Sequence, residues 1–182
     1  MPAYVDVFNT IASLGVIIFQ IIAVVIIVNL VFLRSHSNPV LIFAKEHGIL
    51  AGFLVALGSF CISLFYSEVI GFPACELCWV QRFFIYPQMI IFGMLLVRHK
   101  KLLLDLAIAL SSLGSLVSIY HVYIENGGES GLACVTNNIN VVSCSARYFQ
   151  EFGYVTIPVM ALTAQVLMLV LVLNYRYFSR AK

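Results

Sequence analysis

Residues 71–82 read GFPACELCWVQR, and this stretch opens an apolar segment long enough to cross a membrane. Gly71 and Pro73 break the apolar run before it, so Cys75 and Cys78 stand at the start of the next helix. The N-terminal end of a helix stabilises a thiolate and lowers the pKa of a cysteine placed there. The Cys-x-x-Cys pair is therefore predicted to be redox-active.

The composition is that of a membrane protein. Of the 182 residues, 62% are hydrophobic and 10% are charged, and the mean hydropathy is +1.03. A membrane-spanning helix needs about 20 mostly apolar residues, and the sequence predicts five such segments, over residues 11–33, 48–70, 79–97, 102–124 and 154–175. We therefore expect an all-α integral membrane protein without a sizeable soluble domain or a nucleic-acid partner.

Two short connections, between the second and third and between the third and fourth segments, favour antiparallel neighbours and predict an antiparallel four-helix transmembrane bundle. This core covers residues 48–175, includes an extracytoplasmic loop over residues 125–153, and is followed by a tail over residues 176–182. Residues 1–47 supply one additional N-terminal transmembrane helix and a linker, in which Pro39 is expected to mark the end of a helix. The first segment lacks the basic leader of a secretory signal, so we interpret it as a retained helix.

Basic residues gather on one side of the predicted bundle. Eight of the ten lysines and arginines fall on the side that the positive-inside rule assigns to the cytoplasm: Arg34, Lys45, Arg98, Lys100, Lys101, Arg176, Arg180 and Lys182. The amino terminus is then outside and the carboxyl terminus inside. Both cysteine pairs face the non-cytoplasmic side, where disulfides persist.

The second cysteine pair, Cys134 and Cys144, lies in the long loop. Residues 126–131 read NGGESG, a sequence of low conformational restraint that is expected to let Cys134 change position. Residues 146–152 predict either a short helix on the membrane surface or an ordinary loop. Two cysteine pairs on one side of a membrane favour a relay that passes oxidising equivalents through mixed disulfides.

The four cysteines are also compatible with a second interpretation. Four thiolates can hold zinc tetrahedrally, so the pairs are also compatible with a zinc-stapled, non-enzymatic membrane scaffold. However, the nine residues between Cys134 and Cys144 are atypical of zinc knuckles.

Arg82 lies one helical turn below Cys78, where a guanidinium is predicted either to contact a quinone or to reach the lipid headgroups.

The stretch over residues 71–82, followed by Tyr86 and Pro87, resembles the disulfide bond formation protein B family, particularly its BdbC-like branch in bacteria. Tyr120, His121 and the later cysteine pair extend the resemblance over residues 48–175. The additional N-terminal helix lies outside it.

This resemblance implies a thiol:quinone oxidoreductase of the bacterial cytoplasmic membrane, with ubiquinone or menaquinone as acceptor. It also implies a thioredoxin-like, DsbA/BdbD-like thiol oxidase as the extracytoplasmic partner, and two redox-active disulfides, Cys75–Cys78 and Cys134–Cys144. By motif position, Cys78 is expected nearest the quinone, Cys75 exchanges with the loop pair, and Cys134 receives the partner. Arg82 and His121 are expected to bind the quinone, and no metal is required.

A transmembrane thiol reductant conveyor is a further alternative. It needs cysteines that can be reached from the cytoplasm, and the sequence offers none at such a position.

Overall fold

The structure is a computed structural model, and it describes residues 3–32, 38–98, 100–129 and 143–180. Its helices are α1 (Ala3–Phe32), α2 (Pro39–Leu64), the short π-helix η1 (Phe65–Val69), α3 (Glu76–Val97), α4 (Lys101–Glu125) and α5 (Ile157–Arg180). Five of the helical segments are long and apolar enough to cross a membrane, with α2 and η1 forming one of them. The expected all-α membrane fold is confirmed.

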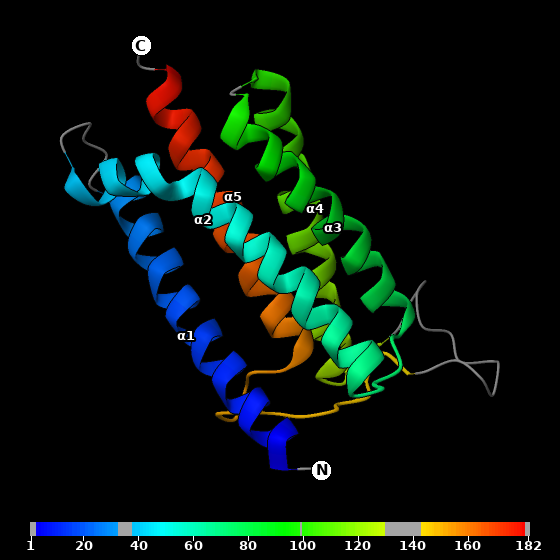
Figure 1. Ribbon diagram of the computed structural model, residues 1–182. Helices are drawn as coiled ribbons and strands as arrows, with labels where there is room; N and C mark the ends of the chain where they lie inside the picture. Colours follow the sequence, from blue (N-terminus) through cyan, green and yellow to red (C-terminus); the bar gives the residue numbers. More distant parts are fainter. Residues whose placement is uncertain (1–2, 33–37, 99, 130–142, 181–182) are drawn as a thin grey trace.

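The last four long helices form a bundle in which each packs on two neighbours. The contacts run from α2 to α3, from α3 to α4, from α4 to α5, and from α5 back to α2. Successive helices run in opposite directions (Figure 1). Neighbouring long helices of the bundle are therefore antiparallel, as predicted.

Hydrogen bonds between polar side chains link the helices in the middle of this bundle. Gln88 of α3 donates a hydrogen bond to Gln165 of α5 at 2.7 Å, and Ser111 of α4 donates one to Gln88 at 2.8 Å. Within a membrane such groups find no water, so helices satisfy them across their interfaces. Gly114 lets α4 and α5 approach closely, because a Cβ added there would clash with the Gln165 side chain.

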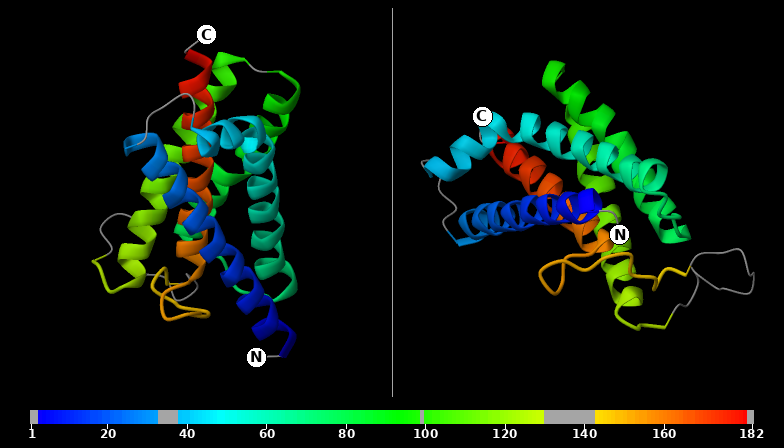
Figure 2. Two further views of the ribbon diagram at one scale, coloured as in Figure 1. Left: turned by 90° about the vertical axis from the view of Figure 1, so that its left-hand side faces the viewer. Right: turned by 60° about the horizontal axis from the view of Figure 1, so that its bottom comes forward.

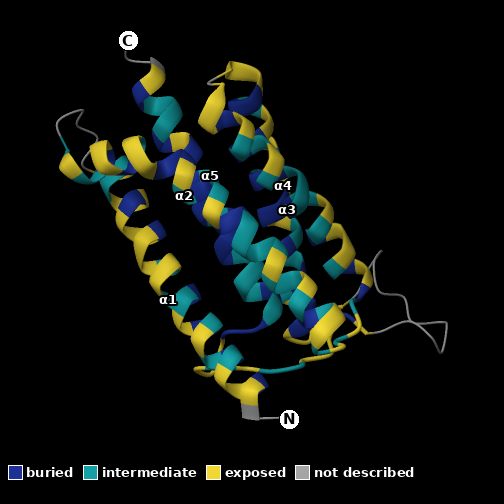
Figure 3. Cartoon of the chain, viewed as in Figure 1, coloured by how far each residue is buried: buried dark blue, intermediate teal, exposed yellow. Residues whose placement is uncertain are grey.

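The additional helix α1 lies outside the ring and packs on α5 and α2 (Figure 2). Most of its outward surface is exposed and apolar (Figure 3), as expected for a face in contact with lipid. The helix is therefore part of the bundle's packing as well as a membrane anchor.

Pro39 starts a helix instead of ending one. The Asn38 side chain accepts a hydrogen bond from the backbone N–H of Val40, and Pro39 occupies the first turn of α2. A proline is favourable there because its missing N–H would have no partner within the helix. Consequently α2 begins nine residues before the apolar segment predicted from residue 48.

Residues 143–156 lie at the same end of the bundle as Cys75 and form a loop. An isolated bridge between Glu151 and Val155 closes its final turn. The surface helix considered for residues 146–152 is therefore wrong, and the loop alternative holds. Positive φ angles at Phe152 (50°) and Gly153 (79°) make the turn and are incompatible with a continuous helix.

Candidate redox site

The first cysteine pair lies at the N-terminus of α3, as its sequence position predicts. Gly71 has a φ of +81°, a conformation that glycine adopts without strain, and this turn separates η1 from α3. Cys75 is the N-cap of α3, and its sulfur accepts the backbone N–H of Cys78 at 3.3 Å. The sulfur therefore satisfies a donor that the helix leaves unpaired.

The two sulfurs of this pair lie close to each other and to an imidazole. Cys75 Sγ and Cys78 Sγ are 2.8 Å apart, and His121 Nε2 of α4 is 3.7 Å from Cys75 Sγ. The hydrogen bond from Cys78, followed by the contact with His121, lowers the pKa of the Cys75 thiol to about 5, against the opposing effect of burial. Of the two thiols of the reduced pair, Cys75 is therefore the one that ionises first.

The loop brings Cys144 to this pair. Cys144 is buried and disulfide-bonded, and it belongs to the same buried cluster as Cys75, Leu77 and Ile124. A small cavity of about 20 Å³ is lined by Cys75, Cys78, His121 and Cys144. Cys134, the predicted partner of Cys144, lies outside the described residues.

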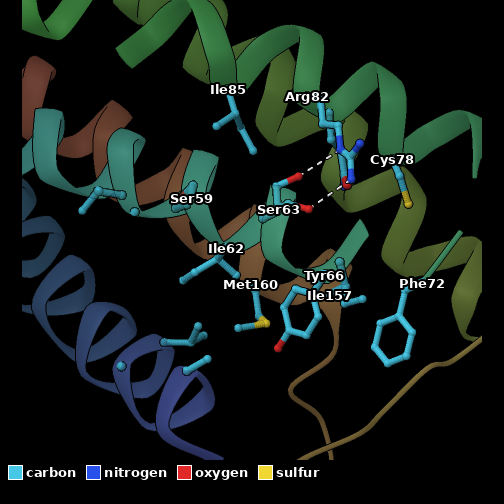
Figure 4. A pocket seen from close by; sticks show the side chains of 18 of the residues that line it. Ser59, Ile62, Ser63, Tyr66, Phe72, Cys78, Arg82, Ile85, Ile157 and Met160 are labelled. Atoms are coloured by element: carbon cyan, nitrogen blue, oxygen red, sulfur yellow. Dashed lines mark hydrogen bonds between the residues drawn. The ribbon is translucent and has the colours of Figure 1, made fainter. Parts of the chain in front are cut away.

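A second and much larger cavity lies on the other side of Cys78. It has a volume of about 330 Å³, and apolar side chains of α1, α2, α3 and α5 form most of its wall. Figure 4 shows Cys78 and Arg82 together at one end of it. Cys78 lines both cavities, whereas Cys75 lines only the small one.

Arg82 points toward α2 and the large cavity. Its Nε donates to Ser63 Oγ at 2.9 Å, and its Nη2 donates to the Ser63 carbonyl oxygen at 3.2 Å (Figure 4). The indole of Trp79 covers the guanidinium at 4.9 Å, a favourable cation–π contact. A guanidinium has five N–H donors, so others remain for an acceptor in the cavity. A role of Arg82 at the cavity rather than at the lipid headgroups stays a prediction.

His121 lies on the small-cavity side of the cysteine pair, and its expected contact with a quinone stays a prediction. It is buried, lies beside Cys75, and lines the small cavity; it is not among the residues lining the large one. Its Nδ1 is buried without a hydrogen-bond partner among the described residues. The structure thus places His121 beside Cys75 and Arg82 at the large cavity.

Metal ligation by four thiolates does not describe this arrangement, because Cys144 is disulfide-bonded. The ligand atoms of Cys75, Cys78 and His121 lie within 4.8 Å of one another, so three ligands are available to a metal. They are the same groups that the redox interpretation uses.

Aromatic side chains that had no predicted role in the site pack together at its loop end. Tyr148 donates a hydrogen bond to the Pro73 carbonyl oxygen at 2.7 Å and stacks on Phe72, with ring centroids 4.6 Å apart. Phe72 stacks in turn on Tyr66 at 5.8 Å. Burial, followed by the charges of the two cysteines, raises the pKa of Tyr148, so its hydroxyl stays protonated and can donate.

Other residues that shape the site belong to no recognisable sequence motif. Ser63 fixes Arg82 from a different helix, Tyr66 projects from the π-helical turn, and α1 lines the large cavity. Each depends on how separate helices pack. The π-helical turn carried no signal in the sequence, although such turns are frequent at functional sites.

Close thiols held at a helix terminus within a bundle of apolar helices define a membrane protein of thiol–disulfide chemistry. The family described as Disulfide bond formation protein DsbB matches residues 45–174, and the chain belongs to this family. The resemblance inferred from the motif is confirmed. No solved structure matches the chain.

Curated relatives carry names consistent with this family. Disulfide bond formation protein C of Bacillus subtilis is 39% identical over 127 residues, covering 66% of this chain and 86% of that protein. Probable disulfide formation protein C 1 of Bacillus cereus is 35% identical over 115 residues, covering 62% and 76%. Probable disulfide formation protein of Oceanobacillus iheyensis is 38% identical over 117 residues, covering 60% and 74%.

Proposed function

We propose that this protein is a thiol:quinone oxidoreductase that reoxidises a thioredoxin-like, DsbA/BdbD-like dithiol oxidase outside the cytoplasm. The observation that carries the proposal is the position of Cys78. It lines the small cavity shared with the loop cysteine and the large apolar cavity shared with Arg82. A sulfur placed between two such cavities can take electrons from one and deliver them to the other.

The large cavity has the properties that a quinone ring requires. Its wall is mainly apolar and its volume of about 330 Å³ lies in the range of small-molecule sites. Arg82 supplies hydrogen-bond donors for a carbonyl oxygen, and Cys78 supplies the electron-donating sulfur. A bound quinone supplies a two-electron, two-proton acceptor. Ubiquinone and menaquinone both meet this description.

The relay begins at the loop. The reduced partner attacks Cys134 of the proposed Cys134–Cys144 disulfide, which releases Cys144 as a thiolate. Cys144 then attacks Cys75 of the oxidised inner pair, and the broken bond releases Cys78. The packing of Cys144 beside Cys75 supports this step.

The next exchange restores the loop pair. The partner's second cysteine attacks the mixed disulfide between the partner and Cys134. The partner leaves oxidised, and Cys134 is released as a thiolate. Cys134 attacks Cys144, and Cys75 leaves. A thiol of low pKa is a good leaving group, so the lowered pKa of Cys75 favours its release.

The inner pair is then oxidised. Cys75 and Cys78 form their disulfide while two electrons and two protons pass to the quinone, giving the quinol. The stabilised thiolate of Cys75 favours the reduced pair and so makes its disulfide a stronger oxidant. This is the property needed to restore a partner that is itself oxidising.

The proposal also assigns orientation and location. Loop 143–156 and the Cys75 end of the bundle face the non-cytoplasmic side of a bacterial cytoplasmic membrane, with the amino terminus outside and the carboxyl terminus inside. The gathering of basic residues at the opposite end supports this assignment.

The test uses purified full-length protein, a reduced DsbA-like protein and added quinone. We expect quinone absorbance to fall only when all three are present, and the Cys78→Ser variant to abolish the change. Metal analysis of the same preparation is the control. Stoichiometric zinc together with no quinone reduction would contradict the proposal and favour the zinc-stapled scaffold.

A further inference from the structure

Helix α1 lies outside the segment that matches the family, which begins at residue 45, yet it forms one wall of the large cavity. Ala12, Gly15, Val16 and Phe19 line this wall. Their spacing places them on one face of the helix. In Figure 4, α1 borders the cavity on the side away from Cys78 and Arg82.

Hydrogen bonds hold this face of α1 in place. Before it, buried Asn9 accepts a hydrogen bond from the Tyr66 hydroxyl at 2.9 Å. After it, Gln20 donates to Thr163 Oγ1 of α5 at 3.0 Å and accepts from the Tyr154 hydroxyl at 2.7 Å. Polar contacts between helices are costly to break within a membrane. The cavity-lining face is therefore fixed between two attachments, which a simple anchor would not need.

Two glycines keep the space beside α1 open. Gly15 of α1 and Gly58 of α2 both line the large cavity, and a Cβ added at either position would meet no atom within 4 Å. Neither glycine has a positive φ. Backbone conformation therefore does not require them, and their effect in this structure is to leave volume.

We propose that α1 and Gly58 form the site for the isoprenoid side chain of the quinone. This inference rests on the proposed function. A ring beside Cys78 and Arg82 leaves the α1 side of the cavity for whatever extends from the ring. Membrane quinones carry an apolar isoprenoid chain, and the α1 wall is apolar. Phe19, which is 36% exposed, lies where that chain continues toward lipid.

The variant Gly15→Leu tests this site by filling it. The probes are menadione, a naphthoquinone without an isoprenoid chain, and a menaquinone that carries one. We expect the apparent KM for the menaquinone to rise about tenfold or more, because added atoms in a filled site are strongly unfavourable. The apparent KM for menadione should stay within about twofold of wild type. The matched control is Val24→Phe, which enlarges a lipid-exposed position of the same helix.

Single-turnover disulfide exchange with the reduced partner, measured without quinone, shows whether each variant is folded. Gly58→Leu fills the same space from α2 and should produce the same selectivity against the menaquinone if Gly15→Leu does not fold. Equal KM values for the menaquinone in wild type and a folded variant would overturn the inference. An equal rise in the apparent KM for both quinones would also overturn it. If wild type reduces neither of these quinones nor a ubiquinone, the proposed function fails instead.

Discussion

The thiolate character of Cys75 gives a quantitative prediction. Its pKa is lowered from 9.0 to about 5, chiefly by the hydrogen bond from Cys78. At pH 6 a thiol with a pKa of about 5 is roughly 90% ionised, and one with a pKa of 9.0 is roughly 0.1% ionised. The ionised fraction is therefore about a thousandfold larger, but a thiolate of lower pKa is intrinsically less nucleophilic, with a Brønsted coefficient of about 0.4–0.5. Alkylation of Cys75 at pH 6 should therefore be on the order of tenfold faster than that of an ordinary thiol. Thiolate reactivity is retained at high pH and lost as the pH falls through about 5.

Replacing the donor tests the cause. The variant Cys78→Ala lacks the hydrogen bond from Cys78, and burial still opposes ionisation of Cys75. The pKa of Cys75 should therefore rise, and alkylation at pH 6 should slow markedly. The assay measures iodoacetamide labelling of the fully reduced protein against pH, with the labelled residue identified by mass spectrometry. A Cys61→Ala background removes an exposed thiol from both proteins. A wild-type Cys75 that titrates near 9, or an unchanged profile in Cys78→Ala, would refute this reasoning.

Three further predictions concern the acceptor, the topology and the order of the relay. Arg82→Ala should raise the apparent KM for quinone about tenfold, the loss of a charged hydrogen bond, and leave exchange with the partner unchanged; unaltered quinone kinetics would favour headgroup contact. Single reporter cysteines at Glu129 and Ser179 should be labelled by an impermeant reagent in intact cells only at position 129, and labelling at 179 alone would reverse the topology. With the partner's resolving cysteine removed, Cys144→Ser should accumulate an adduct through Cys134 on non-reducing gels, and Cys134→Ser none. The two thiols that join in this adduct lose two electrons, which the inner Cys75–Cys78 disulfide accepts by exchange through Cys134. An adduct through Cys75 in a protein without the loop pair would contradict the proposed order.

The membrane architecture was predictable because apolar segments of sufficient length carry their own signal. The start of α3 was predictable for a similar reason, since Gly71 and Pro73 mark a local break before Cys75. Pro39 was misinterpreted because a proline that ends one helix and one that starts another look alike until the cap at Asn38 is seen.

The site was only partly predictable. Arg82 could be placed near Cys78 from helical spacing, but its partner Ser63 comes from another helix. His121 lies beside Cys75, a contact that its sequence position did not indicate, and its expected contact with the quinone stays a prediction. Such positions are set by packing between helices distant in sequence, and local pattern does not encode them. The contribution of α1 to the large cavity is of the same kind.

The central claim is that electrons pass from partner to quinone through two cysteine pairs. The direct measurement counts the partner disulfides formed anaerobically by quinone-free, fully oxidised protein, before and after quinone is added. Without quinone, each protein molecule should oxidise about two partner molecules, one for each disulfide, and then stop. With quinone, oxidation should resume and produce about one quinol for each partner disulfide. Partner oxidation that continues without quinone, or that does not resume when quinone is added, would contradict the account.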